Sequence, residues 1–453
     1  MSKKSLYNHF QPYDDQHLLA YNARSGAVAL MTMENYDMYG RMLEKLAANP
    51  DSPLSDEESK LLEQLKYGKY VCDKHFDELQ ALKFEHYLGR YGRSTLGLVI
   101  APTMACNMGC EYCYEENKTG RMSKEIRDEL MEFVKSHLTE MRQMDVTWYG
   151  GEPLLAMDIV EDLTERFFEM AREHRVGYSS GIVTNGYLMT PDVADKLVKF
   201  MVRNAQVTLD GPARVHNKKR PLKNGKDSFE TIIDNLVYAA PKMRIGVRVN
   251  IDQSFTVDTI KELLEELKNA GLHQKISISF GHLEPATEVC ANIAESCYET
   301  EAFSKTEADF YRQLLAEGFR IDKLPAPSSV TCMAQIVNAF VIDSNGYMYR
   351  CWNYVGDVGK SMGNIRDTID FQHPYFLRLF DVNPFEEKAC RECNLLPICM
   401  GGCPAKRVDR NLAGEEICES WKYNLQPMLE IIAAFKQLEA ELKQEDRNTG
   451  DQS

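Results

Sequence analysis

Hydrophobic and polar positions follow a repeating two-part pattern through the middle of the chain. Short apolar runs alternate with longer stretches in which apolar residues recur every three or four positions. The short runs predict strands and the longer stretches predict helices. The predicted strands are 96–101, 146–149, 181–183, 206–209, 245–251 and 276–280. The predicted helices between them are 123–141, 156–171, 191–201, 228–240 and 257–270.

Strands that alternate with helices of this length indicate βα units around a parallel sheet. Six such units are visible, whereas a complete barrel of this kind has eight. The pattern therefore predicts an α/β fold built on a partial, open (β/α)6 barrel.

The N-terminal part has a different pattern. Two short apolar runs within residues 17–32 flank Ala23-Arg24-Ser25-Gly26, which predicts a hairpin. Helical patterns follow at 36–46 and at 61–67, the second after the helix-starting Ser55. These elements form either a separate small module or a packing extension of the barrel.

The C-terminal part begins with a predicted helix at 302–319 and a linker at 325–327. Asn345-Gly346 between two short apolar runs predicts a tight hairpin. A last helix is expected at 425–443, and the polar residues 444–453 are expected to be disordered. The predicted division of the chain is a leader-recognition-like module at 1–92, the barrel at 93–320, a cysteine-rich domain at 321–425 and a C-terminal helix with its tail at 426–453.

Charge and hydropathy limit the classes of partner. The formal net charge of −15 argues against nonspecific binding of nucleic acid, which needs a basic surface. The first 16 residues contain no apolar signal segment, and no run approaches the roughly 18 apolar residues that span a bilayer. We therefore expect a soluble, cytoplasmic protein without a membrane partner.

Thirteen cysteines are unusual for such a chain, because cytosolic thiols are kept reduced. Their placement indicates metal or redox chemistry rather than disulfides. Three lie close together, at Cys106, Cys110 and Cys113. Seven lie in the cysteine-rich segment, at Cys332, Cys351, Cys390, Cys393, Cys399, Cys403 and Cys418. Cys72, Cys290 and Cys297 remain.

The three-cysteine loop directly follows the first barrel strand. Three thiolates so closely spaced can bind three corners of a 4Fe–4S cluster, and no fourth cysteine lies nearby in sequence. One iron is then open to chelate the amino and carboxylate groups of S-adenosylmethionine. The location suits this role, because barrel active sites lie in loops at the carboxyl ends of the strands. A zinc site completed by a distant ligand, or cysteines without metal, is the alternative.

The loop resembles the signature of the radical S-adenosylmethionine (radical SAM) superfamily, C-x3-C-x2-C with an aromatic residue before the last cysteine. The resemblance implies that Tyr112 lies beside the adenine. Tyr149-Gly150-Gly151-Glu152-Pro153 is similar to the family's GGEP segment, which implies close approach of its small residues to the methionine moiety. Thr184-Asn185-Gly186 and Leu209-Asp210-Gly211-Pro212 resemble the segments after strands three and four. Arg220 is then a candidate partner for the cofactor carboxylate, or else a solvated charge.

The seven-cysteine segment resembles the SPASM extension of many radical SAM enzymes that modify peptides and proteins. The resemblance implies two auxiliary 4Fe–4S clusters, hence three clusters in total. Cys332, Cys351 and Cys403 would hold the first, and Cys390, Cys393, Cys399 and Cys418 the second. The first is one ligand short, which leaves three alternatives: Cys290, Cys297 or a substrate thiolate. A zinc ribbon is the alternative to both clusters.

The family resemblance implies reductive cleavage of S-adenosylmethionine and hydrogen abstraction by a 5′-deoxyadenosyl radical. Anaerobic sulfatase-maturating enzymes typically have an aspartate after the hairpin-closing cysteine, whereas Trp352 follows Cys351 here. We therefore expect a maturase of a ribosomal precursor peptide that forms a thioether crosslink, with a flavodoxin- or ferredoxin-type reductant.

Several other functions stay open from the sequence. Sulfatase-type protein oxidation, peptide epimerisation and carbon–carbon crosslinking are alternatives within the same enzyme class. A zinc-stapled binding protein is the alternative that is not an enzyme. An RNA-modifying enzyme is disfavoured by the acidic balance of the chain.

Overall fold

The computed structural model describes residues 2–115, 119–285, 288–367, 369–410 and 417–450. They form two compact units. The larger unit comprises Tyr91–Asp322 and Cys332–Asp381. The smaller unit comprises Met1–Arg90, Lys323–Thr331 and Val382–Ser453. The four-part division expected from the sequence stays a prediction.

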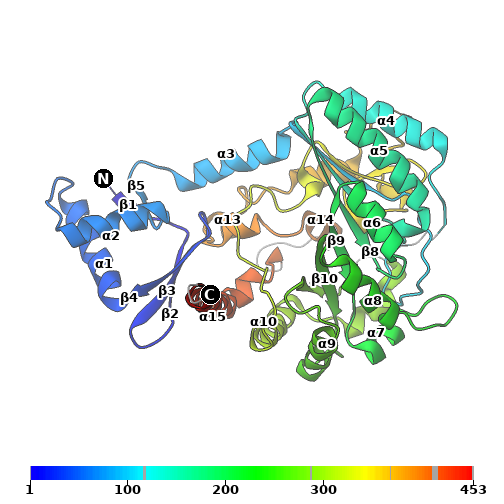
Figure 1. Ribbon diagram of the computed structural model, residues 1–453. Coiled ribbons are helices and arrows are strands. Elements are labelled where there is room, and N and C mark those ends of the chain that lie inside the picture. The colour runs from blue at the N-terminus through cyan, green and yellow to red at the C-terminus, as the bar shows by residue number, and fades with distance from the viewer. Residues whose placement is uncertain (1, 116–118, 286–287, 368, 411–416, 451–453) are drawn as a thin grey trace. The chain divides into compact units, whose positions relative to one another are not determined.

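The larger unit contains a parallel sheet whose six strands follow one another in chain order (Figure 1). They are β6 (Thr95–Ile100), β7 (Gln143–Trp148), β8 (Gly177–Thr184), β9 (Val202–Thr208), β10 (Arg244–Ile251) and β11 (Ile276–His282). Every neighbouring pair is parallel. In the described residues β11 is one edge of the sheet and does not pair with the other edge. The predicted α/β fold with an open, partial barrel is confirmed.

Helices follow these strands along the chain and cover one face of the sheet (Figure 1). They are α4 (Lys124–His137), the 3-10 helix η1 (Pro153–Ala156), α5 (Met157–His174), α6 (Pro191–Lys199), α7 (Ala213–Lys219), α8 (Phe229–Ala239), α9 (Val257–Asn269) and α10 (Thr300–Ala316). Ser123 caps α4, and Thr256 begins α9 with a capping box. Helix α7 was not predicted from the sequence.

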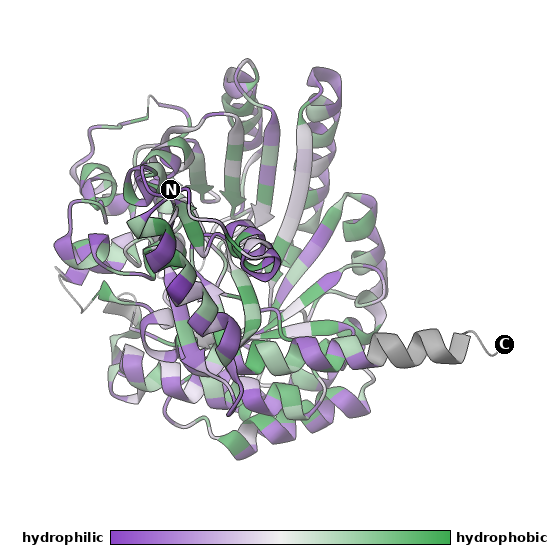
Figure 2. Ribbon diagram, turned by 90° about the vertical axis from the view of Figure 1, so that its left-hand side faces the viewer, coloured by the Kyte–Doolittle hydropathy of each residue, from purple (hydrophilic) through white to green (hydrophobic). Residues whose placement is uncertain are grey.

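Strand β10 illustrates how the two faces of this sheet differ. Ile245, Val247 and Val249 are buried, whereas Arg248 and Asn250 between them are only half-buried. Because successive side chains of a strand point to opposite faces, the apolar residues share one face and the polar ones the other. Figure 2 shows this alternation as green and purple segments along the strands.

The predicted hairpin at Gly346 is present and also extends the barrel sheet. It consists of β12 (Ala339–Ile342) and β13 (Met348–Tyr349), and Gly346 adopts a φ of +85°. Strand β12 pairs in parallel with β6, so the sheet has eight strands. Short elements complete this unit: η2 (Glu288–Ser296), η3 (Met333–Gln335), η4 (Trp352–Tyr354), η5 (Val358–Lys360) and α11 (Pro374–Asp381).

The smaller unit begins with two small antiparallel sheets and three helices. Its strands are β1 (Ser2–Lys4), β2 (Asn8–Pro12), β3 (His17–Asn22), β4 (Ala27–Thr32) and β5 (Val71–Asp73). Its first helices are α1 (Met33–Ala48), α2 (Asp56–Tyr67) and α3 (Glu78–Tyr91, ending in the larger unit). The predicted β3–β4 hairpin is confirmed, and Ser55 starts α2 with a capping box. Strand β2, which pairs with β3, was not predicted.

Strand β3 is buried on both faces. Ala20 belongs to a core with Tyr39 and Met42 of α1. Its neighbour Tyr21 belongs to another core, with Leu429 of the C-terminal helix. The first and last segments of the chain therefore share a hydrophobic core within this unit.

The C-terminal helices of the smaller unit are α12 (Lys388–Arg391), α13 (Leu396–Cys399), α14 (Pro404–Arg410) and α15 (Trp421–Gly450). The expectation of disorder from residue 444 is wrong as far as Gly450, because α15 continues to that residue. Gln444, Glu445 and Arg447 in this stretch are good helix formers. Residues 451–453 lie outside the described residues. Within the described chain, no helix is long and apolar enough to cross a membrane.

Candidate active site

The three-cysteine loop follows β6 and is held by the segment after α7. The backbone N–H of Gly109 donates to the Pro221 carbonyl at 2.9 Å, and that of Lys223 donates to the Asn107 carbonyl at 2.9 Å. The N–H of Met108 lies 3.5 Å from Cys106 Sγ. Backbone contacts on both sides therefore fix the path of the loop.

Gly150 and Gly151 pack against the backbone that leads into this loop. The N–H of Gly151 donates to the Thr103 carbonyl at 3.2 Å. A Cβ on Gly151 would lie 2.4 Å from the carbonyl oxygens of Met104 and Ala105, and Gly150 has a φ of +116°. The family resemblance implies that these two glycines allow the methionine moiety of the cofactor to approach closely. Their closest neighbours in the structure are instead backbone atoms of the residues that lead into the cysteine loop.

Glu152 is a fully buried carboxylate that joins two loops. Its Oε1 accepts hydrogen bonds from Leu154 N–H at 3.0 Å and from Thr184 Oγ1 at 2.7 Å. Its Oε2 accepts from Asn185 N–H at 2.8 Å. Burial raises the pKa of this carboxyl, although the hydrogen bonds oppose the shift. Glu152 thus fixes the loop after β8 to the loop after β7.

Asn185 continues this network into the cysteine loop. Its Nδ2 donates to Asn107 Oδ1 at 2.7 Å. Two buried donors beside the cysteines, Asn107 Nδ2 and Arg220 Nε, have no hydrogen-bond acceptor among the described residues. A ligand that carries acceptor atoms would satisfy them.

Tyr112, Asp210 and Arg220 form a polar cluster at the wall of the site. Tyr112 donates to Asp210 and accepts from Arg220. Arg220 Nη1 lies 3.5 Å from Asp210 Oδ2, and only 9% of Arg220 is exposed. The alternative that Arg220 is a solvated charge is therefore wrong.

The ionisation of this cluster follows from its contacts. Burial, with a contribution from Asp210, holds the pKa of Tyr112 well above its ordinary value. Burial alone would lower the pKa of Arg220, but Tyr112, Cys110 and Asp210 together hold it well above its ordinary value. The tyrosine is therefore a neutral phenol and the arginine a cation at neutral pH.

His216 holds the backbone of Asp210 through a hydrogen bond. Its Nδ1 accepts the backbone N–H of Asp210 at 3.2 Å, so Nε2 carries the proton and donates to Ser228 Oγ at 3.1 Å. Burial lowers the pKa of this completely buried histidine to about 3. The side chain of Asp210 is held separately, because its Oδ1 accepts from Asn250 N–H at 3.0 Å.

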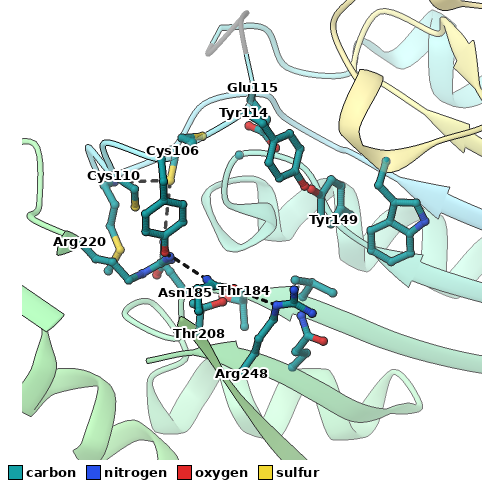
Figure 3. Close-up of a pocket in the computed structure, with 18 of the residues that line it drawn as sticks. Cys106, Cys110, Tyr114, Glu115, Tyr149, Thr184, Asn185, Thr208, Arg220 and Arg248 are labelled. Atoms are coloured by element: carbon teal, nitrogen blue, oxygen red, sulfur yellow. Dashed lines mark hydrogen bonds between the residues drawn. The ribbon is translucent and has the colours of Figure 1, made fainter. Parts of the chain in front are cut away.

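These residues surround a cavity of about 560 Å³ at the carboxyl ends of the strands (Figure 3). Of the site residues predicted from sequence, nine line it: Cys106, Cys110, Tyr112, Cys113, Gly150, Gly151, Thr184, Asn185 and Arg220. Glu152 and Pro153 are buried but are not among its lining residues. The volume is within the range of about 300–1,000 Å³ that is typical of small-molecule sites.

The neighbourhoods of Cys332 and Cys351 meet within the larger unit. Trp352 Nε1 lies 2.8 Å from the sulfur of Met333, so the residues that follow the two cysteines are in contact. Arg350 is buried and donates to the carbonyls of Ala334 and Ala339, at 3.3 Å and 2.6 Å. The hairpin thus brings both cysteines to one region, as the sequence predicted.

Four further cysteines gather in the smaller unit. Burial raises the pKa of Cys390, and the nearby thiols of Cys393 and Cys418 raise it further. Burial raises the pKa of Cys399 to about 11, again with Cys390 and Cys418 nearby. Cys403 belongs to the same unit, where its N–H donates to Glu419 Oε1 at 3.1 Å.

The donor chemistry of the three-cysteine loop fits an iron–sulfur cluster. Among the described residues, no three His, Cys, Asp or Glu side chains converge closely enough to hold a single metal ion. A cubane cluster does not require such convergence, because each thiolate binds a different iron. Cys106, Cys110 and Cys113 on one cavity wall, next to two buried donors without acceptors, suit a cluster with an organic ligand beside it.

Several residues of the cavity were not singled out from the sequence. They are Gln206, Thr208, Arg248, Asn250, His282 and Glu284. Four of them, Thr208, Asn250, His282 and Glu284, are polar residues at or just after the carboxyl end of a predicted strand, whereas Gln206 and Arg248 lie earlier in theirs. A polar residue at that end becomes a specific signal only when the strands are known to be adjacent.

A parallel open barrel with three cysteines on its first loop defines a class, the barrel enzymes that use an iron–sulfur cluster. Residues 100–267 match the Radical SAM superfamily, so the chain carries a radical SAM domain and is an enzyme. Its cofactors accordingly include S-adenosylmethionine and a 4Fe–4S cluster.

Two curated relatives are similar over most of their length. The serine-type anaerobic sulfatase-maturating enzyme of Bacteroides thetaiotaomicron is 26% identical over 369 residues, which is 71% of this chain and 85% of the relative. Mycofactocin maturase MftC of Mycolicibacterium smegmatis is 26% identical over 349 residues, 70% of this chain and 81% of the relative.

Solved structures share the fold. Native anSMEcpe with bound AdoMet has a TM-score of 0.60 at 22% identity and covers 76% of this chain and 100% of its own. Streptococcus suis SuiB bound to precursor peptide SuiA has a TM-score of 0.52 at 14% identity and covers 90% of this chain and 97% of its own.

Proposed function

We propose that this enzyme is a peptide maturase that uses S-adenosylmethionine to form a thioether crosslink in a ribosomally made precursor peptide. The three-cysteine loop on the wall of the cavity carries the proposal. Two similar curated proteins are named as maturases. Cleavage of the cofactor at this loop supplies a 5′-deoxyadenosyl radical for hydrogen abstraction.

The residues around the loop bind and orient the cofactor in this proposal. Cys106, Cys110 and Cys113 hold the cluster. Tyr112 contacts the adenine, and Arg220 binds the cofactor carboxylate through the part of its guanidinium that faces the cavity. Glu152 keeps Thr184 and Asn185 in place beside them.

The remaining cysteines are assigned to two auxiliary clusters. Cys390, Cys393, Cys399 and Cys418 hold one, supported by the mutual proximity of their thiols within the smaller unit. The family resemblance assigns the other to Cys332, Cys351 and Cys403. The contact between Met333 and Trp352 supports the nearness of the first two. Its fourth ligand is Cys290, Cys297 or a thiolate of the substrate; Cys290 is 1% exposed.

Trp352 stands where the sulfatase-maturating enzymes typically have an aspartate, which disfavours their reaction for this chain. The position after Cys351 carries an indole here, and an indole has no group that accepts a proton at neutral pH. The peptide-maturation proposal does not need a carboxylate at the position after Cys351. Epimerisation and carbon–carbon crosslinking remain the alternatives to a thioether.

The precursor peptide is proposed to bind the smaller unit by strand addition. Among the described residues β4 pairs only with β3, so its other edge presents backbone N–H and C=O groups. Leu30 on this strand is 42% exposed. An extended leader peptide binds such an edge through main-chain hydrogen bonds.

The experiment is anaerobic incubation of the reduced holoenzyme with S-adenosylmethionine and short cysteine-containing peptides encoded near its gene. A thioether removes two hydrogen atoms from the peptide and protects one cysteine from alkylation. Loss of two hydrogen atoms with every cysteine still alkylated indicates a carbon–carbon bond instead. An unchanged mass despite release of 5′-deoxyadenosine excludes crosslinking, and deuterium uptake from D2O would then indicate epimerisation.

The physiological electron donor is proposed to be a flavodoxin or ferredoxin. Metal analysis distinguishes the enzyme from a zinc-stapled binding protein. Three clusters predict about twelve irons per chain. Stoichiometric zinc in a colourless protein would contradict the cluster assignment.

A further inference from the structure

A positive charge without an ionic partner among the described residues lies on the inward face of the barrel sheet. Arg248 of β10 lines the cavity, and its side chain extends from the sheet into the pocket (Figure 3). Its Nε donates to Asn250 Oδ1 at 3.0 Å, which is a neutral acceptor. Within the described ranges, no carboxylate lies within ion-pair distance of its guanidinium. The other arginine of the cavity differs, because Arg220 is paired with Asp210.

The neighbouring strand makes room for this guanidinium. Gly281 of β11 lies opposite Asn250 in the parallel register. A Cβ on Gly281 would lie 2.5 Å from Arg248 Nη2 and 2.7 Å from its Cζ and Nε. Glycine inside a strand weakens that strand, and it commonly marks a place where another group must approach the backbone closely. The absence of a side chain at Gly281 therefore leaves the space that the Arg248 guanidinium occupies.

The residues around the Arg248 guanidinium leave its outer part exposed to the cavity. Gln206 and Thr208, on the adjacent strand β9, are neutral. Glu284 lies on the same cavity wall, where its Oε1 is 3.9 Å from His282 Nδ1. A cation that is half-buried loses part of its hydration, and an anionic ligand restores the lost interaction.

We propose that Arg248 binds a carboxylate of the substrate, carried by an acidic side chain next to the modified residue. Guanidinium binds carboxylate through two parallel hydrogen bonds, which orients the ligand as well as holding it. Such a contact would place the reacting carbon of the substrate relative to the cysteine loop. The proposal deepens the proposed function and rests on it for the location of the substrate.

The same chemistry has a second source, the methionine carboxylate of the cofactor. Modification of Arg248 by phenylglyoxal in the anaerobic holoenzyme distinguishes the two, with the extent measured by mass spectrometry of the Arg248 peptide. The probes are two capped tripeptides, one with glutamate and one with glutamine between two glycines. Each is added at millimolar concentration with and without S-adenosylmethionine.

The glutamate tripeptide should slow the modification of Arg248 in the presence of S-adenosylmethionine, and the glutamine tripeptide should not. Complete protection by S-adenosylmethionine alone would assign Arg248 to the cofactor and overturn the substrate proposal. Modification at one rate under all conditions would also overturn it. The assay needs no turnover, so its result is independent of whether a peptide is crosslinked.

Variants give a second measurement on the same holoenzyme. Wild-type enzyme should bind the glutamate tripeptide about tenfold more tightly than the glutamine one, because hydrogen bonds between charged groups are about twice as strong as neutral ones. Arg248→Gln should abolish this preference and Arg248→Lys should retain part of it. Arg244→Gln, at the exposed start of the same strand, should keep it in full. An unchanged preference in Arg248→Gln would contradict the proposal even if phenylglyoxal protection is seen.

Discussion

Trp352, the residue after Cys351, packs edge to face against Tyr149, the residue before Gly150, with ring centroids 4.8 Å apart and an interplanar angle of 71°. Burial raises the pKa of Tyr149 above its ordinary value, and the nearby thiols of Cys113 and Cys351 raise it further. Tyr149 therefore lies between the three-cysteine loop and the hairpin that carries Cys351. The pair forms part of the cavity wall.

This aromatic contact predicts a measurable coupling between the two loops. Edge-to-face pairs contribute about 0.5–1.5 kcal/mol beyond the area they bury. A double-mutant cycle of Tyr149→Leu and Trp352→Leu, followed by chemical denaturation, should give a coupling of about 1 kcal/mol. Strictly additive effects of the two substitutions would show that the rings do not stabilise each other.

Gly151→Ala should disrupt the three-cysteine loop. The new Cβ would lie 2.4 Å from two carbonyl oxygens of the backbone, which cannot move without displacing the loop. We expect loss of the iron bound by that loop together with lower stability. The matched control is Gly40→Ala in α1, where nothing lies within 4 Å, and it should raise stability by about 0.5–1 kcal/mol. Normal iron content in Gly151→Ala, measured by colorimetric assay, would contradict the role given to this glycine.

Glu152→Gln should destabilise the larger unit. All three groups bonded to the carboxylate are donors, so an amide NH2 in place of one oxygen must face a donor. A buried group without its hydrogen bond costs about 1–3 kcal/mol, and we expect a loss of this size in urea denaturation. Glu165→Gln, on the exposed side of α5, should change stability by no more than about 0.5 kcal/mol. Equal effects of the two substitutions would exclude a structural role for the Glu152 network.

His216→Asn should flatten the dependence of stability on pH. Because the folded pKa of His216 is about 3, below the ordinary value of 6.5, the unfolded chain binds more protons between these two values. The histidine therefore stabilises the fold fully above pH 6.5, and this contribution falls by up to about 1.4 kcal/mol per pH unit as the pH is lowered towards 3. Asparagine preserves an acceptor near Nδ1 but does not titrate.

The measurement is urea denaturation of wild type and variant between pH 7.5 and 5. The difference in unfolding free energy between the two proteins should shrink as the pH falls. The other titrating groups are common to both proteins and cancel in this difference. A difference independent of pH would mean that the pKa of His216 in the folded protein equals its ordinary value, as for an exposed histidine.

Replacing Cys106, Cys110 and Cys113 together by alanine should abolish cleavage of S-adenosylmethionine. The auxiliary clusters are assigned to other cysteines, so the iron content should fall from about twelve to about eight per chain. Iron analysis and chromatography of 5′-deoxyadenosine test the two statements separately. Continued production of 5′-deoxyadenosine would contradict the assignment of the catalytic cluster to this loop.

The six βα units and the spacing of the cysteines could be predicted from the sequence by itself. Both are local properties, since a strand or helix is recorded in its own hydrophobic period and a cluster motif in a few neighbouring residues. The hairpin at Gly346 was predictable for the same reason, because neighbouring turn residues, Asn345 and Gly346, mark it in the sequence. Its pairing with β6 was not, since nothing within the hairpin specifies the strand beside it.

Only the tertiary structure decided how the charges of the site are partnered. Arg220 follows two lysines and looks like a surface residue in sequence, yet it is buried against Asp210. Arg248 is one of the polar positions that alternate with apolar ones along β10. The glycine that makes room for its guanidinium lies more than thirty positions away, on the next strand. Such partners are brought together by the parallel register of the sheet, which no local pattern encodes. The ionisation and binding properties of a cavity therefore depend on contacts that exist only after the chain has folded.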